Sequence, residues 1–421
     1  MNSESYAKNG YNLDGNCPIC GNDNIKLGYR IKYLGLLEQI LEGSDSIDDS
    51  HGGGGMYEQE ICTCDHCGFA WVSNPIPQSF LDDYYKYMSK YENEDSIGKQ
   101  DFSHKKMFKR QFDFINCLVS DYNSILDIGA ATGENLSLYK ACGKDVTGIE
   151  PSSQNKIYAF EKYKIKMYDM TFEEYYEKRG ERQNYDLVFL SHTIEHIVEV
   201  RGFIDKVAKI ASKYIFIEIP FLENQGKGLE PFGLFTNEHV NYFTINSLTC
   251  LMNEVGFHLI KGNIEFNIGG IVPGYPTLVT LWSRGRVAHK KNEILSIPSA
   301  SKLVRDYVDM SLVGLERINR IIDSISDREK LAVWGTGTHT YRLLGMTKLG
   351  NKNIVKFYDS DKKKQGLTML GKKIQPFDIA DLKRGEVETI FISSFGSEDA
   401  IRECINREHI LVPYKVIGLY S

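Results

Sequence analysis

The sequence predicts an α/β protein in which two Rossmann-like units follow a small N-terminal metal-binding module. Three observations lead to this fold class. An apolar run at residues 124–128 leads into a glycine-rich turn, a helical segment and a second apolar run that ends at Glu150. A shorter unit of the same kind begins at residue 331, and two Cys-x-x-Cys-Gly sequences lie near the N-terminus. Strands that alternate with helices are typical of parallel sheets with helices on both faces.

Length and composition narrow the possible classes of protein. A chain of 421 residues is long enough for two or three domains. Its net charge of -6 offers no basic excess to neutralise phosphates, so we expect no nucleic-acid partner. No apolar run reaches the roughly 18–20 residues that span a bilayer, and the first residues show no apolar signal core. We therefore expect a cytoplasmic protein without a membrane partner, present as a monomer or a homodimer.

Shifts in pattern along the chain suggest the domain boundaries. We expect a zinc-binding module at residues 1–74 and a cofactor-binding domain at 75–285, whose first part, 75–120, is a helical lead-in. A charged helical connector at 286–330 and a C-terminal Rossmann-like domain at 331–421 complete the prediction. The C-terminal domain has the short glycine turn of a βαβ unit and lacks a complete dinucleotide fingerprint.

The two Cys-x-x-Cys-Gly sequences predict a metal site. Four thiolates can surround zinc tetrahedrally, and such a closed site stabilises the fold rather than catalysing a reaction. The predicted ligands are Cys17, Cys20, Cys64 and Cys67. Cys62 could replace Cys64, His66 is a weaker competitor, and a redox role is less favoured because the motif occurs twice. The remaining single cysteines are expected to be buried thiols: Cys117, Cys142, Cys250 and Cys404.

The turn after the first strand is the most informative motif. It reads Asp-x-Gly-x-x-x-Gly, with Asp127 before the first glycine, Gly129. A carboxylate here would repel a pyrophosphate, which disfavours a dinucleotide, but it suits a ligand that carries an ammonium group. Glu150, at the tip of the next strand, is the right group to accept hydrogen bonds from two ribose hydroxyls.

This segment resembles motif I of the class I S-adenosylmethionine (SAM) methyltransferases. The resemblance implies that SAM is the cofactor, with Glu150 on its ribose and Asp127 and Gly129 near its methionine end. Ala130 and Gly133 would complete the small-residue turn, which lets the backbone approach the ligand closely. A generic βαβ unit with an incidental acid is the alternative.

Three further residues are candidates for the cofactor site. Asp169 follows a short apolar run and could bind the adenine amino group. Residues 185–196 look like the strand–loop segment of the same superfamily that lies beside the methyl donor, and this strand leads into Ser191. Tyr87 belongs to the aromatic run at 80–91, which could cap the cofactor or could instead pack the zinc module onto the domain.

The order of the parts resembles that of the deoxysugar C-methyltransferases, which act on nucleotide-linked ketosugars. Its most specific element is Glu238-His239 together with Phe243. In that family the Glu-His pair and a histidine after the preceding strand lie at the sugar, which implies such roles for Glu238, His239 and His196. The chain departs from the family at Thr236, where the pattern has a tyrosine, and it lacks a lysine after the C-terminal glycine turn.

The chemistry follows from these residue types. Methylation of a carbon beside a ketone needs a base that removes a proton, so that the resulting enolate attacks the methyl group. A histidine that titrates near neutrality suits this role. The same histidine could serve an O- or N-methyltransferase acting on a sugar or another small polar metabolite. A non-catalytic module that binds SAM or a nucleotide, and an oxidoreductase that uses the C-terminal domain, remain weaker alternatives.

Overall fold

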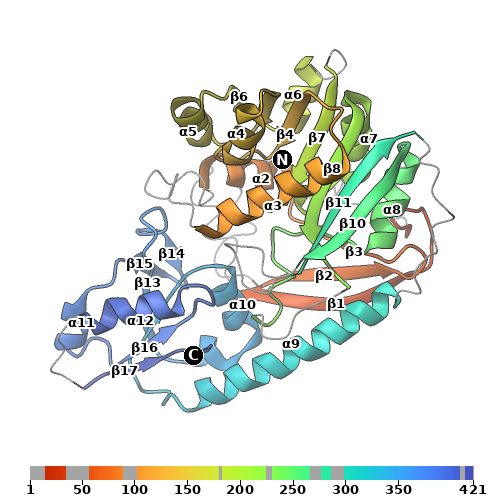
Figure 1. The fold of residues 1–421 in the computed structure, drawn as a ribbon. Coiled ribbons are helices and arrows are strands. Elements are labelled where there is room, and N and C mark those ends of the chain that lie inside the picture. Colours follow the sequence, from red (N-terminus) through yellow and green to blue (C-terminus); the bar gives the residue numbers. More distant parts are fainter. Residues whose placement is uncertain are drawn as a thin grey trace, which may run out of the picture. The chain divides into compact units, whose positions relative to one another are not determined.

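The computed structural model describes residues 15–34, 56–88, 102–179, 183–223, 230–265, 276–285, 298–407 and 413–420 (Figure 1). The strands of these residues form sheets of four, seven and six strands. Helices accompany the two larger sheets, which is the α/β architecture that the sequence predicts.

The seven-stranded sheet contains the glycine turn. Its strands are β4 (Ser124–Ile128), β5 (Asp145–Ile149), β6 (Met167–Tyr168), β7 (Tyr185–Ser191), β8 (Ala211–Pro220), β10 (Phe257–Glu265) and β11 (Thr277–Arg284), in the order β10-β11-β8-β7-β4-β5-β6. Neighbours from β6 to β8 pair in parallel, whereas β11 is antiparallel to β8 and to β10. The chain reverses direction across the sheet between β4 and β7, and ligands of such sheets bind at the carboxyl ends of the strands at this point.

Helices cover both faces of this sheet. They are α3 (Phe102–Leu118), α4 (Glu134–Ala141), α5 (Ser153–Tyr163), α6 (Phe172–Arg179), α7 (Val200–Ile210) and α8 (Ile245–Glu254). Buried residues of α3, α4 and α5 share one apolar cluster with the sheet. Right-handed crossovers place α6 and α7 on the opposite face, where Phe172 and Phe203 pack edge to face at 4.9 Å.

A smaller sheet accompanies the cysteine motifs. It has the order β1-β2-β3-β9 and consists of β1 (Ile25–Leu34), β2 (Met56–Cys64), β3 (Phe69–Val72) and β9 (Asn241–Tyr242). Helix α2 (Gln78–Asp83) and the π-helical turn η3 (Tyr84–Met88) follow β3. Because β9 pairs with β3, the sheet holds the chain directly after Glu238 and His239.

The C-terminal residues form the third sheet, with the order β14-β15-β13-β12-β16-β17. Its strands are β12 (Leu331–Trp334), β13 (Ile354–Tyr358), β14 (Thr368–Met369), β15 (Lys372–Gln375), β16 (Thr389–Ile392) and β17 (Lys415–Ile417). Its helical segments are α9 (Ala300–Asp323), α10 (Thr338–Met346), η7 (Lys348–Asn351), α11 (Ile379–Lys383) and α12 (Glu398–Asn406). All pairs except β14 with β15 are parallel, so the expected Rossmann-like C-terminal domain is present.

The chain divides into two compact units. The first lies within residues 1–29, 60–229 and 237–306, and the second within 30–59, 230–236 and 307–421. The sequence-based boundaries place 230–236 within the cofactor-binding domain at 75–285, whereas in the structure this short segment groups with the C-terminal sheet. The difference arises because the segment has no regular secondary structure of its own, so its sequence pattern does not show where it packs.

The single cysteines and the described helices can be compared with the expectations from the sequence. The prediction that the single cysteines are buried is wrong for most of them: Cys117, Cys142 and Cys404 are exposed, and Cys250 is partly exposed. Three of them lie in helices, α3, α8 and α12, and Cys142 follows α4 directly, so the cysteines occupy positions that solvent reaches. Among the described helices, we find no candidate for a transmembrane segment.

Candidate active site

The turn after β4 has a backbone that only small residues accept. Gly129 and Gly133 have φ angles of +82° and +71°, in the left-handed region that favours glycine. A Cβ at Gly129 would lie 3.1 Å from Oγ1 of Thr193, and one at Gly133 would lie 3.0 Å from Cβ of Ala159. The glycines therefore bring the backbone of this turn close to β7 and α5.

Glu150 follows β5 and faces this turn. Its Oε2 accepts a hydrogen bond from the backbone N–H of Ala131 at 2.9 Å, and its Oε1 accepts one from Ser152 at 3.1 Å. These bonds fix the carboxylate, which is 8% exposed. Each carboxylate oxygen has two lone pairs and can accept more than one hydrogen bond.

Asp127 lies on β4 and is 4% exposed. Its Oδ2 accepts a hydrogen bond from Nδ2 of Asn135 at 3.3 Å. Burial, and then the negative charge of Glu150, raise the pKa of Asp127 to about 7, although the Asn135 bond opposes this shift. A cationic ligand group beside Asp127 would favour its ionised form.

The other candidate cofactor residues are less clearly placed. Asp169 forms an ion pair with Lys156 at 2.7 Å, so its carboxylate is already engaged. Ser191, the last residue of β7, accepts a hydrogen bond from Nε2 of Gln111 at 3.0 Å. The side chain of Tyr87 lies outside the part of the chain that the structure describes.

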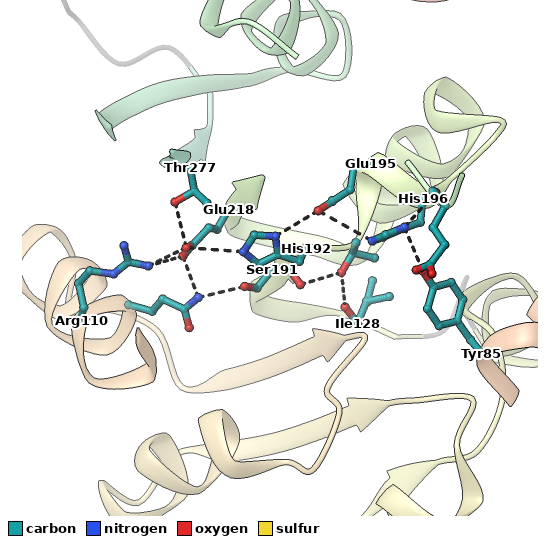
Figure 2. A network of polar contacts seen from close by, with 12 residues as sticks. Tyr85, Arg110, Ile128, Ser191, His192, Glu195, His196, Glu218 and Thr277 are labelled. Atoms are coloured by element: carbon teal, nitrogen blue, oxygen red, sulfur yellow. Dashed lines mark hydrogen bonds and ion pairs between the residues drawn. The ribbon is translucent and has the colours of Figure 1, made fainter. Parts of the chain in front are cut away.

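The end of β7 carries a strained histidine. His192 has a φ angle of +52°, and its N–H donates to the carbonyl of Glu218 at 2.8 Å. Its Nδ1 lies 3.2 Å from Oε1 of Glu195 (Figure 2). Burial opposes the charged imidazole, but the hydrogen bond and charge of Glu195, with Glu218, outweigh it and raise the pKa of His192. Left-handed backbone at a non-glycine residue is often found at functional sites.

Glu218 of β8 is a carboxylate that lies close to His192 and forms an ion pair with Arg110. It is fully buried. One guanidinium nitrogen of Arg110, Nη2, donates to both of its carboxylate oxygens, at 2.6 and 2.8 Å. Nε2 of Gln111 and Oγ1 of Thr277 also donate to it, at 2.8 and 3.3 Å (Figure 2). A buried carboxylate without such partners would be strongly destabilising, so these bonds hold the strand ends in a defined arrangement.

Three of the predicted catalytic residues lie together. The rings of His196 and His239 are 4.8 Å apart between centroids, in an edge-to-face arrangement. The hydroxyl of Tyr85 donates to Oε2 of Glu238 at 2.9 Å and lies 3.0 Å from Nδ1 of His196. That Nδ1 is also 3.0 Å from the carbonyl oxygen of Glu238, which can only accept, so it carries the hydrogen.

This group lies beside the glycine turn. The backbone N–H of Val240 donates to the carbonyl of Glu195 at 2.8 Å, which holds the Glu-His segment against the short helix η6 (Ile194–His196). Oγ1 of Thr193, directly before that helix, donates to the carbonyl of Ile128 at 3.0 Å. The predicted catalytic residues and the glycine turn are therefore adjacent at the ends of β4 and β7.

Glu195, His196 and His239 also offer one ligand atom each within 4.8 Å of one another. Zinc–nitrogen bonds of about 2.0–2.1 Å in a tetrahedral site require donor atoms about 3.3 Å apart. Nε2 of His196 is 4.0 Å from Oε1 of Glu195. The group as described is thus more open than a zinc site and fits a set of proton-transfer residues better.

The four predicted metal ligands form a compact cluster. Sγ of Cys17 lies 3.6 Å from Sγ of Cys67, and Sγ of Cys20 lies 3.7 Å from Sγ of Cys64. Zinc–sulfur bonds of about 2.3 Å in a tetrahedron place the sulfurs about 3.8 Å apart. The spacing of the thiols therefore fits a four-cysteine metal site.

Comparisons with known proteins agree with this geometry. Residues 78–261 match a family described as a methyltransferase domain. C-methyltransferase NovU of Streptomyces niveus is 22% identical over 376 residues, which cover 85% of this chain and 84% of that protein. The chain is a SAM-dependent methyltransferase. Its seven-stranded unit has the class I α/β methyltransferase fold that the sequence predicts, and residues 327–417 match a family described as C2185-like, N-terminal.

Solved structures were also compared with this methyltransferase. Magnesium protoporphyrin IX methyltransferase of Synechocystis PCC 6803 is 13% identical and covers 49% of this chain and 97% of its own, with a TM-score of 0.36. The 1,6-didemethyltoxoflavin-N1-methyltransferase of Burkholderia thailandensis is 13% identical. The match covers 54% of this chain and 96% of that protein, with a TM-score of 0.39.

Sequence reasoning missed several residues of this methyltransferase site. Arg110, His192 and Glu218 form a charged network in which Glu218 is fully buried and the other two are partly exposed. His192 lies in the predicted 185–196 segment without a predicted role, and Arg110 and Glu218 stand in no predicted motif. Tyr85 was within the aromatic run that the sequence singles out, but its contact with Glu238 joins residues far apart in the chain. The predicted Glu238, His239 and His196 do come together, and Asp127, Gly129 and Glu150 line one turn.

Proposed function

We propose that this methyltransferase transfers a methyl group to a carbon atom of a nucleotide-linked ketosugar through a base-generated enolate. The observation that carries the proposal is the cluster of His196, Glu238, His239 and Tyr85 beside the glycine turn. The name of the Streptomyces niveus relative, a C-methyltransferase, supports a carbon acceptor. The sugar-nucleotide substrate rests on the resemblance to the deoxysugar family.

In this mechanism the cofactor supplies an electrophilic methyl group. The imidazole of His239 removes the proton from the carbon beside the ketone, and the electrons of that C–H bond pass to the carbonyl oxygen. The resulting enolate carbon would be the nucleophile toward the methyl group that the bound cofactor would supply, with the demethylated cofactor as the leaving group. Glu238, held by Tyr85, stabilises the protonated imidazole next to it, and the proton then leaves to solvent.

An O- or N-methyltransferase is the alternative, because the same histidine could deprotonate a hydroxyl or an ammonium group. The test is to incubate the protein with SAM labelled with ¹³C at its methyl group and a panel of nucleotide-linked 4-ketosugars. The carbon spectrum of the product then shows whether the label is bonded to carbon, oxygen or nitrogen. A methyl on oxygen or nitrogen would contradict the carbon-acceptor mechanism and leave the methyltransferase assignment intact.

We also propose roles for the individual residues of the cofactor site. Glu150 would accept hydrogen bonds from the ribose hydroxyls, and Asp127 would pair with the ammonium group of the methionine end. The turn and the candidate residues around it would complete the site: Gly129, Ala130, Gly133, Asp169, Ser191 and Tyr87.

The Glu150→Ala variant is expected to bind SAM about tenfold or more weakly, because it removes the partner of two hydroxyls. Hydrogen bonds to charged groups contribute roughly 1.5–3 kcal/mol each. Calorimetry measures the affinity, and Glu161→Ala, which removes an exposed glutamate of α5, is the matched control. Because Glu150 also accepts two backbone N–H groups, the melting temperature of each variant is measured as well. Unchanged affinity in a folded Glu150→Ala protein would contradict the ribose role.

The affinity for SAM is expected to rise with pH. The pKa of Asp127 is raised to about 7, so the carboxyl is protonated below this pH and cannot pair with an ammonium group. Binding to the ionised form alone predicts about a tenfold loss of affinity between pH 8 and pH 6. Calorimetry across this range checks the slope, and Asp127→Asn should bind weakly with a flat profile. A wild-type protein with pH-independent affinity would show that Asp127 does not pair with the cofactor.

For the cysteine cluster we propose one structural zinc ion held by Cys17, Cys20, Cys64 and Cys67. The sulfur spacings support this assignment. Four thiolates leave no open position on the metal, so zinc would stabilise the fold around β2 and β3 and take no part in methyl transfer.

A further inference from the structure

The residues just before the catalytic pair belong to the second unit. Segment 230–236 lacks regular helix or strand structure, and Glu238 and His239 follow it directly. Phe232, Leu234 and Phe235 are 0–1% exposed. A stretch of irregular backbone that is this deeply buried needs partners for its polar groups.

Helix α9 supplies two of these partners. The N–H of Leu234 donates to the hydroxyl of Tyr307 at 2.7 Å, and the N–H of Phe232 donates to Oγ of Ser311 at 3.0 Å. Tyr307 and Ser311 are each 2% exposed, so water cannot replace either hydroxyl. The ring of Tyr307 also packs edge to face against Phe235, with centroids 4.9 Å apart.

Helix α10 and strand β1 hold the two ends of the segment. Nη1 of the fully buried Arg342 donates to the carbonyl of Pro231 at 2.7 Å and lies 3.3 Å from Oε1 of Glu230. The hydroxyl of Tyr33, also buried, donates to the carbonyl of Phe235 at 2.6 Å. Side chains from three elements of one unit thus fix the backbone of the segment.

The backbone of segment 230–236 is held in its position by the residues packed around it. Phe232 has a φ angle of +58°, which is strained for a bulky residue and persists only where the surroundings hold it. Gly314 lies within α9, where a Cβ would come 2.7 Å from Cγ of Pro231. Glycine costs about 1 kcal/mol relative to alanine inside a helix, so its presence is explained by this close approach.

From these observations we propose that Tyr307, Ser311 and Arg342 are positioning residues of the methyltransferase. Their hydrogen bonds hold segment 230–236, and the continuous chain then limits where Glu238 and His239, two and three residues further on, can lie. The inference rests on the proposed catalytic role of that pair. Proton transfer needs the base within hydrogen-bond reach of the substrate, and a displacement of about 1 Å can cost about 10²-fold in rate.

Tyr307→Phe tests the proposal, since it removes one buried hydroxyl and keeps the ring. The matched control is Tyr358→Phe in the same unit. Tyr358 is equally buried, and its hydroxyl donates to Asp381 at 2.6 Å, away from the segment. Both variants should lose similar thermal stability. Only Tyr307→Phe should lower kcat for the ketosugar, by about tenfold, while SAM affinity measured by calorimetry stays within about twofold of wild type.

Hydrogen–deuterium exchange supplies a readout that needs no substrate. Peptides that contain Leu234 and the catalytic residues, including the amide of Val240, should exchange at least about tenfold faster in Tyr307→Phe than in Tyr358→Phe. Ser311→Ala, a smaller change, should show the same pattern more weakly if Tyr307→Phe does not fold. Unchanged exchange at residues 237–240 would overturn the proposal. Faster exchange with kcat equal to that of the control would overturn it too.

The two parts of the test separate this inference from the proposed function. If wild-type protein methylates none of the ketosugars, the substrate assignment fails, and the exchange measurement alone still decides whether the Tyr307 hydroxyl orders the Glu-His segment. If ketosugars are methylated and the exchange rates of the two variants agree, the positioning role fails and the proposed function stands.

Discussion

Replacement of His239 by alanine is expected to lower kcat by about 10²–10⁴-fold, the usual contribution of a general base. SAM affinity should stay close to wild type, because His239 lies with His196 and Glu238 rather than on the glycine turn. His239→Asn should not restore activity, since an amide cannot take up the proton. Steady-state kinetics with an accepted ketosugar, together with calorimetry for SAM, measures both quantities.

His258→Ala is the control for this experiment. His258 is a partly exposed histidine on β10, with Nδ1 2.9 Å from Oδ1 of Asn253, and its removal should leave kcat unchanged. Full turnover by His239→Ala would show that the base is elsewhere. His196 would then be the next candidate, because its Nδ1 is occupied by Tyr85 and Glu238 while Nε2 remains the basic nitrogen of the neutral ring.

Proton removal can also be observed without methyl transfer. In deuterated water, wild-type protein should exchange the acidic carbon-bound hydrogen of the ketosugar when the demethylated cofactor product replaces SAM. His239→Ala should not catalyse this exchange. If His239→Ala exchanged this hydrogen at the wild-type rate, His239 would not be the base, even if overall turnover had fallen for another reason.

The sequence predicted those parts of the fold that depend on short segments. The strand that begins at residue 331 and the strand that ends before Glu150 are predictable because runs of apolar residues are bounded by glycine or an acid. The turn at Gly129 and Gly133 was recognised for the same reason, since a left-handed backbone restricts the residue type locally. Such features need no knowledge of distant contacts.

The buried network could not be predicted in this way. Arg110 and Glu218 are far apart in the chain, and only the packing of α3 against β8 brings them together. An arginine in a charged helix is common, so Arg110 does not stand out. The one available signal was Glu218 itself, because a carboxylate within an otherwise apolar strand needs a buried partner.

The grouping of segment 230–236 with the second unit was equally hidden. Its partners Tyr33, Tyr307 and Arg342 come from three separate stretches of the chain. The strained φ angle of Phe232 leaves no trace in the residue type, because glycine rather than phenylalanine is expected there. Only tertiary structure shows that these residues contact the chain just before Glu238 and His239.

Removal of zinc is expected to have the largest effect on stability. Zinc at about a thousand times its Kd stabilises the folded state by about 4 kcal/mol, and for a domain of this size that corresponds to roughly 8–16 °C in melting temperature. Ile61, Phe69 and Val72 are fully buried beside the cysteines, so loosening the cluster would expose an apolar core. Elemental analysis should give one zinc per chain, and calorimetric melts with and without a chelator measure the shift.

Cys67→Ser should reproduce the effect of the chelator, because it removes one of the four thiolates. Cys117→Ser is the matched control: Cys117 is exposed on α3, so its substitution should leave both the zinc content and the melting temperature unchanged. A chelated protein that melts at the temperature of the zinc-bound form would contradict a structural role. The cluster holds β3, and β3 pairs with β9 directly after His239. Zinc loss should therefore lower the apparent kcat, calculated per total protein, in proportion to the unfolded fraction. The kcat calculated per folded protein should stay unchanged.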